Sequence, residues 1–251
     1  MRRKQDLGSI LVTVLLAAAA SEPSGTVRIF AASSLTDALG EALASYEASH
    51  PGVRVVFQFG ASNDLARQIL AGAPSHLFFS ADETQMDHVE AGGLLEPGSR
   101  RDLLSNQLVL VVPRASAIAV ESPEVLERVP KIALADPEAV PAGVYARQYL
   151  EKRGLWERLR RRVVPTLDVR AALAAVASGN VDAGFVYRTD AKLEPRVRVA
   201  FEVPCDEGPR IRYPLSVLRG GGDEAERLFR FLTSPEAREV FERHGFVVLG
   251  E

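Results

Sequence analysis

The chain has 251 residues, of which 47% are hydrophobic, and its formal net charge at pH 7 is −3. This length and composition suffice for one large or two modest domains with a buried core. An acidic chain is a poor partner for nucleic acid, because such binding depends on clustered lysines and arginines facing phosphate. Cys205 is the single cysteine, so no intramolecular disulfide can form and the core alone must stabilise the fold.

The first twenty residues have the composition of a secretory signal. Arg2, Arg3 and Lys4 precede an apolar run over residues 7–20 that ends on small residues. The run is shorter than the roughly 20 apolar residues that a membrane-spanning helix needs, which favours cleavage near Ala20 over an uncleaved anchor. Cleavage removes three basic residues and one acidic residue, so the net charge changes from −3 to −5. We therefore predict that residues 1–20 are a signal peptide. The mature protein is expected to be periplasmic or otherwise exported, and soluble after cleavage of the signal.

Short runs of apolar and β-branched residues alternate along the chain with segments of helical periodicity. This alternation is typical of an α/β fold in which helices connect the strands of a largely parallel sheet. The predicted strands are residues 27–30, 53–59, 77–79, 107–112, 131–134, 162–164 and 183–186.

Helices are recognisable from the spacing of their apolar residues. From Leu35 to Tyr46, apolar residues recur at i, i+3, i+4, i+7, i+8 and i+11, so one face of this helix is buried. The other predicted helices include residues 65–70, 169–176, 223–232 and 235–244.

Two segments are candidates for connections between domains. The predicted strand 107–112 lies in the middle of the chain, and residues 211–218 contain Pro214. Proline suits an edge or crossing segment better than a central strand, because it has no backbone N–H to donate. On this interpretation lobe 1 is discontinuous and consists of residues 26–105 and 215–251, and lobe 2 spans residues 106–214. Ligands of such folds bind at the carboxyl ends of strands, beside helix N-termini.

Four places share one feature: a strand ends, and small or hydroxylated residues then begin a helix. They lie at residues 30–34, 59–63, 136–143 and 165–169. A helix start leaves backbone N–H groups unpaired and carries a partial positive charge, so it can bind an anion without lysine or arginine. Each turn alone is better explained as ordinary helix capping. Four such turns at equivalent strand ends favour an anion site.

The residues around these turns carry a resemblance to a known family. The strings are FAASSLTDAL (30–39), FGASNDLARQILAGAP (59–74), LFFSAD (77–82), ADPEAVPAGVYARQYL (135–150), DVRAALAAV (168–176) and GFVYRTDA (184–191). They resemble, in the same order, those of the periplasmic molybdate-binding proteins of ABC importers, and the resemblance covers essentially the whole chain after the signal. It implies a two-lobed α/β fold of the type II periplasmic binding-protein class, in which each lobe is a mostly parallel sheet flanked by helices and the ligand lies between the lobes.

The resemblance implies five ligand contacts. Ser34 and Ser62 match residues that offer a hydroxyl and a backbone N–H, Ala142 and Val169 match residues that offer a backbone N–H, and Tyr187 matches a phenolic donor. Molybdenum would be present only as molybdate, contacted through its oxygens by these residues. The resemblance implies no cofactor and no catalytic residue.

The function implied is that of an exported solute-binding protein, which captures molybdate, or tungstate, and delivers it to the membrane permease of an ABC importer. We expect a monomer with no nucleic-acid partner. Sulfate and phosphate are the near alternatives, because the same donors suit all three tetrahedral oxyanions.

Three positions depart from the family's usual pattern. Ser33 stands where alanine is common, Asn63 where serine or glycine is common, and His76 where aspartate is usual. None of these changes removes a donor. We interpret Asn63 as a helix cap and His76 as a surface or strand-edge residue, because no second metal ligand lies at a recognisable spacing.

Two other classes of function remain as alternatives. An exported hydrolase could assemble Ser34, Asp37, Asp82 and His88, but the chain has no G-x-S-x-G elbow, no H-E-x-x-H motif and no paired-cysteine metal site. Asp82 is better explained as a cap of the helix that follows residue 79. A regulatory domain of the same fold would need an attached DNA-binding or membrane-spanning segment.

Overall fold

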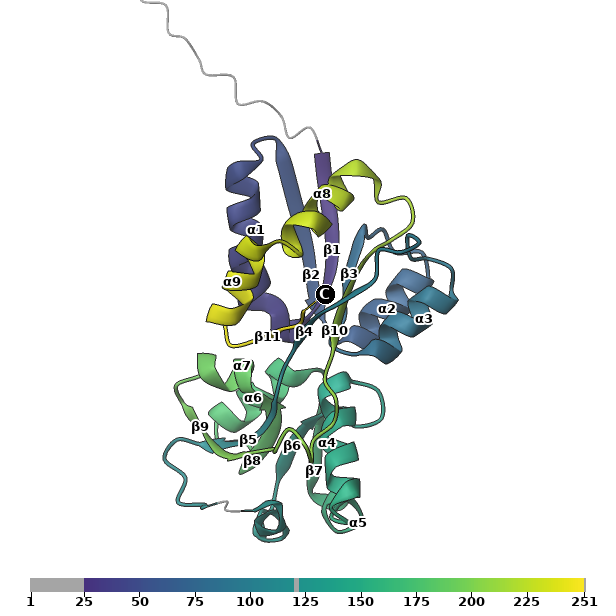
Figure 1. The fold of residues 1–251 in the computed structure, drawn as a ribbon. Coiled ribbons are helices and arrows are strands. Elements are labelled where there is room, and N and C mark those ends of the chain that lie inside the picture. The colour runs from purple at the N-terminus through teal and green to yellow at the C-terminus, as the bar shows by residue number, and fades with distance from the viewer. Residues whose placement is uncertain (1–24, 120–121, 251) are drawn as a thin grey trace, which may run out of the picture.

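The computed structural model describes residues 25–119 and 122–250, and the predicted signal peptide over residues 1–20 lies outside them. The described residues form two sheets, each flanked by helices and stacked one above the other in Figure 1. Within residues 25–119 and 122–250, no helix has the length and apolar character needed to cross a membrane.

The first sheet is built from both ends of the described chain. Its six strands run in the order β11-β4-β10-β3-β1-β2. They are β1 (Gly25–Ala32), β2 (Val53–Gly60), β3 (Leu77–Phe79), β4 (Arg101–Ser105), β10 (Tyr213–Val217) and β11 (Val247–Val248). Its helical segments are η1 (Ser33–Leu35), α1 (Thr36–Ser49), α2 (Ser62–Leu70), α3 (Glu83–Ala91), α8 (Gly222–Leu232) and α9 (Pro235–Arg243). In Figure 1, α1, α8 and α9 lie to one side of this sheet, and α2 and α3 lie to the other.

The second sheet is built from the middle of the chain. Its five strands run in the order β7-β6-β8-β5-β9. They are β5 (Leu108–Pro113), β6 (Ile132–Ala135), β7 (Val163–Thr166), β8 (Ala183–Tyr187) and β9 (Val197–Glu202). Its helical segments are η2 (Pro123–Arg128), α4 (Pro141–Lys152), α5 (Trp156–Leu159), η3 (Arg160–Arg162), α6 (Val169–Ala177) and α7 (Arg188–Leu193).

The predicted two-lobed α/β fold is confirmed, and most strands of each sheet share one direction, although both sheets are mixed. In the first sheet β1 is parallel to β2 and β3, whereas β10 is antiparallel to β3 and β4, and β11 to β4. In the second sheet β6 is parallel to β7 and β8, whereas β5 is antiparallel to β8 and β9. The reason is that β5 and β10 each follow a crossing between sheets. They enter their new sheet at the carboxyl ends of its parallel strands, and therefore run against them.

Pro214 is in the interior of a sheet, not at an edge as its sequence context suggested. The strand β10 does follow a crossing, but it lies between β4 and β3. Its register with β4 shifts between Tyr213 and Pro214, so the missing N–H falls at an irregularity of the ladder, where proline is tolerated. The carbonyl of Pro214 accepts a hydrogen bond of 3.0 Å from the Ser80 backbone N–H. The lobe boundaries, 26–105 with 215–251 and 106–214, stay a prediction, and the strand membership of the two sheets supports them.

The helix predicted after Ser34 is present, with a modified start. Residues Ser33–Leu35 form a 3-10 turn and the α-helix begins at Thr36. Leu39, Ala42 and Tyr46 are fully buried against the first sheet, as the spacing predicts. The burial of this face anchors the turn that carries Ser34.

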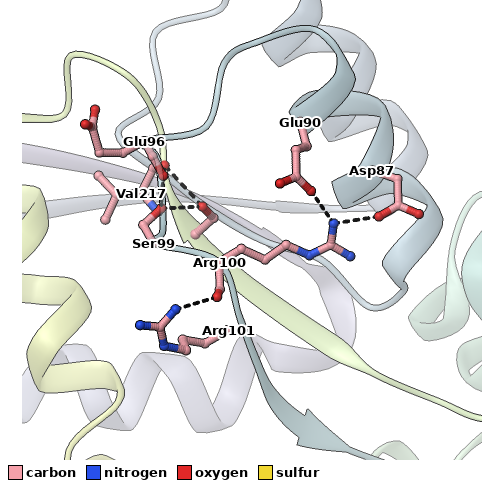
Figure 2. Close-up of polar contacts among 8 residues, drawn as sticks. Asp87, Glu90, Glu96, Ser99, Arg100, Arg101 and Val217 are labelled. Atoms are coloured by element: carbon pink, nitrogen blue, oxygen red, sulfur yellow. Dashed lines mark hydrogen bonds and ion pairs between the residues drawn. The ribbon is translucent and has the colours of Figure 1, made fainter.

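The connection from α3 to β4 is held by polar contacts that Figure 2 shows. The Arg100 guanidinium lies between Asp87 and Glu90 of α3 and forms ion pairs with both. Beside it, the Ser99 hydroxyl donates to the Glu96 carbonyl at 2.8 Å. These contacts fix the start of β4, and the chain crosses to the second sheet after the other end of this strand.

Candidate functional site

A small pocket lies between the two lobes, at the carboxyl ends of strands from both sheets. Its empty space is about 200 Å³, part of which is open to solvent, and this is smaller than the 660–1020 Å³ of the other pockets described. Its twelve lining residues are Ala32, Ser33, Ser34, Gly60, Ala61, Ser62, Ala81, Val140, Pro141, Ala142, Val169 and Tyr187. All five residues predicted from the sequence are among them. Larger pockets, such as one of about 660 Å³ beside the crossing segments, contain none of the five.

Four helical segments begin at this pocket, one from each of the predicted turns. The segments η1, α2, α4 and α6 start at Ser33, Ser62, Pro141 and Val169 respectively. Only α6 has a side-chain cap, in which Asp168 accepts from the Ala171 N–H at 2.9 Å. The other three begin without one. The serines therefore do not act as ordinary caps, and the free N–H groups and positive ends of these helices face one small space.

Gly143 allows α4 to begin close to the second sheet. A Cβ atom at this position would lie 1.9 Å from the Ala135 carbonyl oxygen and 2.7 Å from the Asp136 carbonyl oxygen. Both atoms belong to the backbone, which cannot rotate away. Glycine is thus required for the first turn of α4, with Ala142, to lie at the end of β6.

Four residues with hydroxyl groups line the pocket: Ser33, Ser34, Ser62 and Tyr187. The Ser62 Oγ accepts the backbone N–H of Ala81 at 2.9 Å, and the Ser34 Oγ lies 3.0 Å from the Tyr213 hydroxyl. The Tyr187 hydroxyl is buried, and within the described part of the chain it has no hydrogen-bond partner of normal geometry, although it lies close enough to Tyr213 to influence its pKa. A buried hydroxyl without a partner is costly, so Tyr187 has a donor to offer a ligand.

The pocket is uncharged and its lining is buried. Its lining contains no acidic or basic side chain, and the five predicted residues are each at most 3% exposed. Burial raises the pKa of Tyr187 well above its ordinary value, with the neighbouring tyrosines and carboxylates adding to the effect. Its hydroxyl therefore stays protonated and can donate. An anion in this pocket would lose its water and would have to regain hydrogen bonds from these uncharged donors.

The profile of the bacterial extracellular solute-binding proteins matches residues 27–247. The chain belongs to this family. The molybdate-binding protein ModA of Escherichia coli K12 is 38% identical over 231 residues, which cover 89% of this chain and 90% of that protein. A putative ABC transporter substrate-binding lipoprotein of Bacillus subtilis, YvgL, is 39% identical over 228 residues, which cover 90% of this chain and 88% of that protein.

Solved structures agree on the fold of this solute-binding protein. The substrate-binding domain of a putative molybdenum ABC transporter from Clostridium difficile is 33% identical, with a TM-score of 0.70, and the match covers 90% of this chain and all of that one. The periplasmic molybdate-binding protein of Azotobacter vinelandii has a TM-score of 0.79 at 24% identity and covers 90% of this chain and 100% of that chain, and it supports the fold alone.

The two lobes of this solute-binding protein contact each other around the pocket. Arg170 of α6 pairs with Asp37 of α1 at 2.7 Å, and the Lys192 ammonium donates to the Arg243 carbonyl at 2.8 Å. Arg170 also lies 2.6 Å from a carboxylate oxygen of the fully buried Asp190.

Asn63 and His76, which depart from the usual family pattern, each form a hydrogen bond within the first lobe of the solute-binding protein. Asn63 does not cap α2, contrary to our interpretation: Ala61 is the N-cap, and the Asn63 amide donates to Asp64 at 3.1 Å. The cause is that the helix begins at Ser62, two residues earlier than a cap at Asn63 would require. His76 is half-buried and lies directly before β3, and its Nδ1 accepts the Arg28 backbone N–H at 3.1 Å.

The residues of the hypothetical hydrolase have other partners in the solute-binding protein. Asp82 caps α3 by accepting from the Gln85 N–H at 3.2 Å, as expected, and Asp37 pairs with Arg170. Among the described residues no cluster of three or more His, Cys, Asp or Glu could hold a metal ion.

Proposed function

We propose that this protein captures molybdate, or tungstate, in the pocket between its lobes and delivers it to the membrane permease of an ABC importer. The single observation that carries the proposal is the convergence of four helix starts and four hydroxyl-bearing residues on one small, buried, uncharged pocket. The printed names of the relatives support the choice of ligand and transporter, since several are molybdate-binding proteins and one is assigned to a molybdenum ABC transporter.

The proposed contacts to the oxyanion come from both lobes. Ser34 and Ser62 contribute hydroxyl and backbone N–H groups from the first lobe, and Ala142, Val169 and Tyr187 contribute two backbone N–H groups and a hydroxyl from the second. Each hydrogen bond to a charged group contributes roughly 1.5–3 kcal/mol. The helix N-termini add favourable electrostatics without introducing a titrating cation. A dianion can therefore be held strongly by a pocket that has no charge of its own.

We further propose that residues 1–20 are cleaved on export. The mature protein works as a monomer in the periplasm or an equivalent exterior compartment. Molybdate is its cargo and not a cofactor, and the protein performs no catalysis on it. The lobes correspond to residues 26–105 with 215–251 and to residues 106–214.

Sulfate is the nearest alternative ligand, because it is also a tetrahedral dianion without a proton. Calorimetric titration with molybdate, tungstate, sulfate and phosphate separates these ligands. We expect the first two to bind with the highest affinity. Preferred binding of sulfate would transfer the proposal to that anion, and the absence of binding by all four would overturn it. Recovery of unchanged oxyanion and no turnover of ester substrates distinguish a binding protein from a hydrolase.

Replacing Tyr187 with phenylalanine tests the site itself. The change keeps the ring and deletes only the unpartnered hydroxyl, so molybdate affinity should fall about ten- to a hundredfold. Tyr149 provides a matched control, because its buried hydroxyl also has no hydrogen-bond partner among the described residues but does not line the pocket. We expect Tyr149→Phe to leave affinity unchanged. Equal affinity in both variants would mean that Tyr187 does not contact the ligand.

A further inference from the structure

A second cavity lies against the two chain segments that connect the lobes. These connecting segments are residues 106–107, between β4 and β5, and residues 203–212, between β9 and β10 (Figure 1). The empty space of this hinge cavity is about 660 Å³, part of which is open to solvent. Its lining shares no residue with the pocket between the lobes. The twelve lining residues are Ser105, Asn106, Gln107, Leu108, Val203, Pro204, Cys205, Gly208, Pro209, Arg210, Ile211 and Arg212.

Hydrogen bonds in the wall of the hinge cavity join the two connecting segments. The Gln107 side-chain amide donates to the Val203 carbonyl at 3.0 Å, and the Ser105 hydroxyl donates to the Ile211 carbonyl at 2.8 Å. Two lobes move relative to each other through conformational changes in the few residues that connect them. A molecule bound in the hinge cavity would therefore contact both segments on which opening and closing depend.

The hinge cavity is positively charged, although the chain as a whole is acidic. Arg210 and Arg212 line it, and none of its twelve lining residues is acidic. Neither guanidinium forms an ion pair or hydrogen bond within the part of the chain that the structure describes. Asp206 and Glu207 of the same segment do not line the cavity, and Glu207 pairs with Arg153 at 3.1 Å. No lining residue therefore neutralises the two positive charges.

The lining combines an unsatisfied donor with an apolar wall. The Arg212 Nε is buried and has no hydrogen-bond partner among the described residues, which is costly for a charged group. Leu108 and Ile211, which also line the cavity, are buried apolar residues. Guanidinium groups bind carboxylates and phosphates through paired N–H groups. Apolar side chains with a few polar groups are typical of sites for organic ligands.

We propose that the hinge cavity binds a small organic anion, whose carboxylate or phosphate group pairs with Arg210 and Arg212. The bound anion holds the connecting segments in the arrangement of this structure, in which the lobes contact each other around the pocket. It therefore stabilises the closed arrangement and raises molybdate affinity, and by linkage molybdate raises the affinity for the anion by the same factor. This coupling rests on the proposed function, whereas the site itself does not.

Cys205 reports occupation of the hinge cavity without molybdate. It lines the cavity, is exposed, and is the only cysteine of the chain. Succinate and glycerol phosphate are the two probes, and succinamide is the control that keeps the succinate skeleton without charge. We expect at least one probe, at millimolar concentration, to slow the alkylation of Cys205 by iodoacetamide several-fold, and succinamide to have no effect. The probe that protects distinguishes a carboxylate ligand from a phosphate ligand.

Arg210→Gln and Arg212→Gln each remove one charge from the hinge cavity. Both should abolish the protection of Cys205 and the binding of the probe in calorimetric titration. Arg238→Gln is the matched control, because the Arg238 Nε is also buried without a partner in the described chain, but Arg238 does not line the cavity. Melting temperatures show whether the variants are folded. Arg210 is exposed, so its variant tests the site even if the loss of Arg212 unfolds the protein.

Titration with molybdate, in the presence and absence of the protecting probe, tests the coupling. We expect the probe to raise molybdate affinity about fivefold or more in the wild type and in Arg238→Gln, and to have no effect in Arg210→Gln. If neither probe protects Cys205, or if protection persists in both cavity variants, the hinge cavity is not an anion site and the inference is wrong. Unchanged molybdate affinity in a protein that binds the probe overturns the coupling. Binding of the probe without binding of molybdate would refute the proposed function and leave the site standing.

Discussion

Replacing Gly143 with alanine tests how closely the first turn of α4 must approach the second sheet. The added Cβ would lie 1.9 Å from the Ala135 carbonyl oxygen and 2.6 Å from the carbonyl carbon. To reach even 3.0 Å from that oxygen, the helix must move by at least about 1.1 Å, because the obstacle is backbone. Overpacking of this kind costs roughly 1–3 kcal/mol of folding free energy.

The same movement displaces the Ala142 N–H from the pocket. A hydrogen bond lengthened by about 1 Å is lost, and a bond to an anion contributes roughly 1.5–3 kcal/mol. We therefore expect Gly143→Ala to weaken molybdate binding about ten- to a hundredfold, in addition to lowering stability.

Gly40, within α1, provides the matched control. A Cβ at Gly40 meets no atom within 4 Å, and alanine is favoured over glycine in a helix by about 1 kcal/mol. Gly40→Ala should raise the free energy of unfolding and leave affinity unchanged. Urea denaturation and calorimetric titration with molybdate give both quantities for each variant. Wild-type stability and affinity in Gly143→Ala would refute the close approach on which the geometry of the pocket depends.

Three further predictions concern protonation and closure. Burial raises the pKa of Asp82 from 3.8 to about 6, so the folded state holds this proton more tightly than the unfolded state, and stability is lost as pH rises through that interval. The free energy of unfolding of Asp82→Asn should therefore rise relative to wild type by on the order of 1–3 kcal/mol between about pH 4 and pH 8, and an unchanged difference in denaturation experiments would contradict this. Asp37→Asn breaks the ion pair with Arg170 that joins the lobes, and should weaken molybdate binding up to about fivefold, whereas Glu224→Gln, within a single helix, should not. Small-angle scattering should show a smaller radius of gyration on saturation with molybdate, because the ligand stabilises the closed arrangement, and a constant radius would argue against two moving lobes.

Most elements of the fold could be predicted from local patterns. The spacing of apolar residues from Leu35 to Tyr46 places them on one face of a helix, whichever surface that face is packed against. This helix could therefore be predicted from the sequence. The strands β4, β9 and β11 were not predicted, since β4 has only two buried residues, β9 lies at an edge with much of its surface exposed, and β11 has two residues. Short or exposed strands have little hydrophobic pattern to detect.

The sequence by itself determined the turns that face the pocket. Small and hydroxylated residues at a strand end, followed by a helix, specify a free helix N-terminus through local chemistry alone, and the motifs around Ser34, Ser62, Ala142, Val169 and Tyr187 predicted which turns lie together. The structure brings all five residues to one pocket.

Only the tertiary structure decided the direction of the strands and the contacts behind the pocket. Whether β5 and β10 run with or against their neighbours depends on the end at which the chain enters each sheet, and no local pattern encodes that. Tyr213 and Asn106 are 107 residues apart, and Arg170 is 133 residues from Asp37. Such pairs arise because both crossings pass beside the pocket and the lobes meet around it. The hydrogen-bond donors of the pocket could therefore be predicted from the sequence. The contacts behind these donors and the contacts that join the lobes depend on residues that only folding brings together.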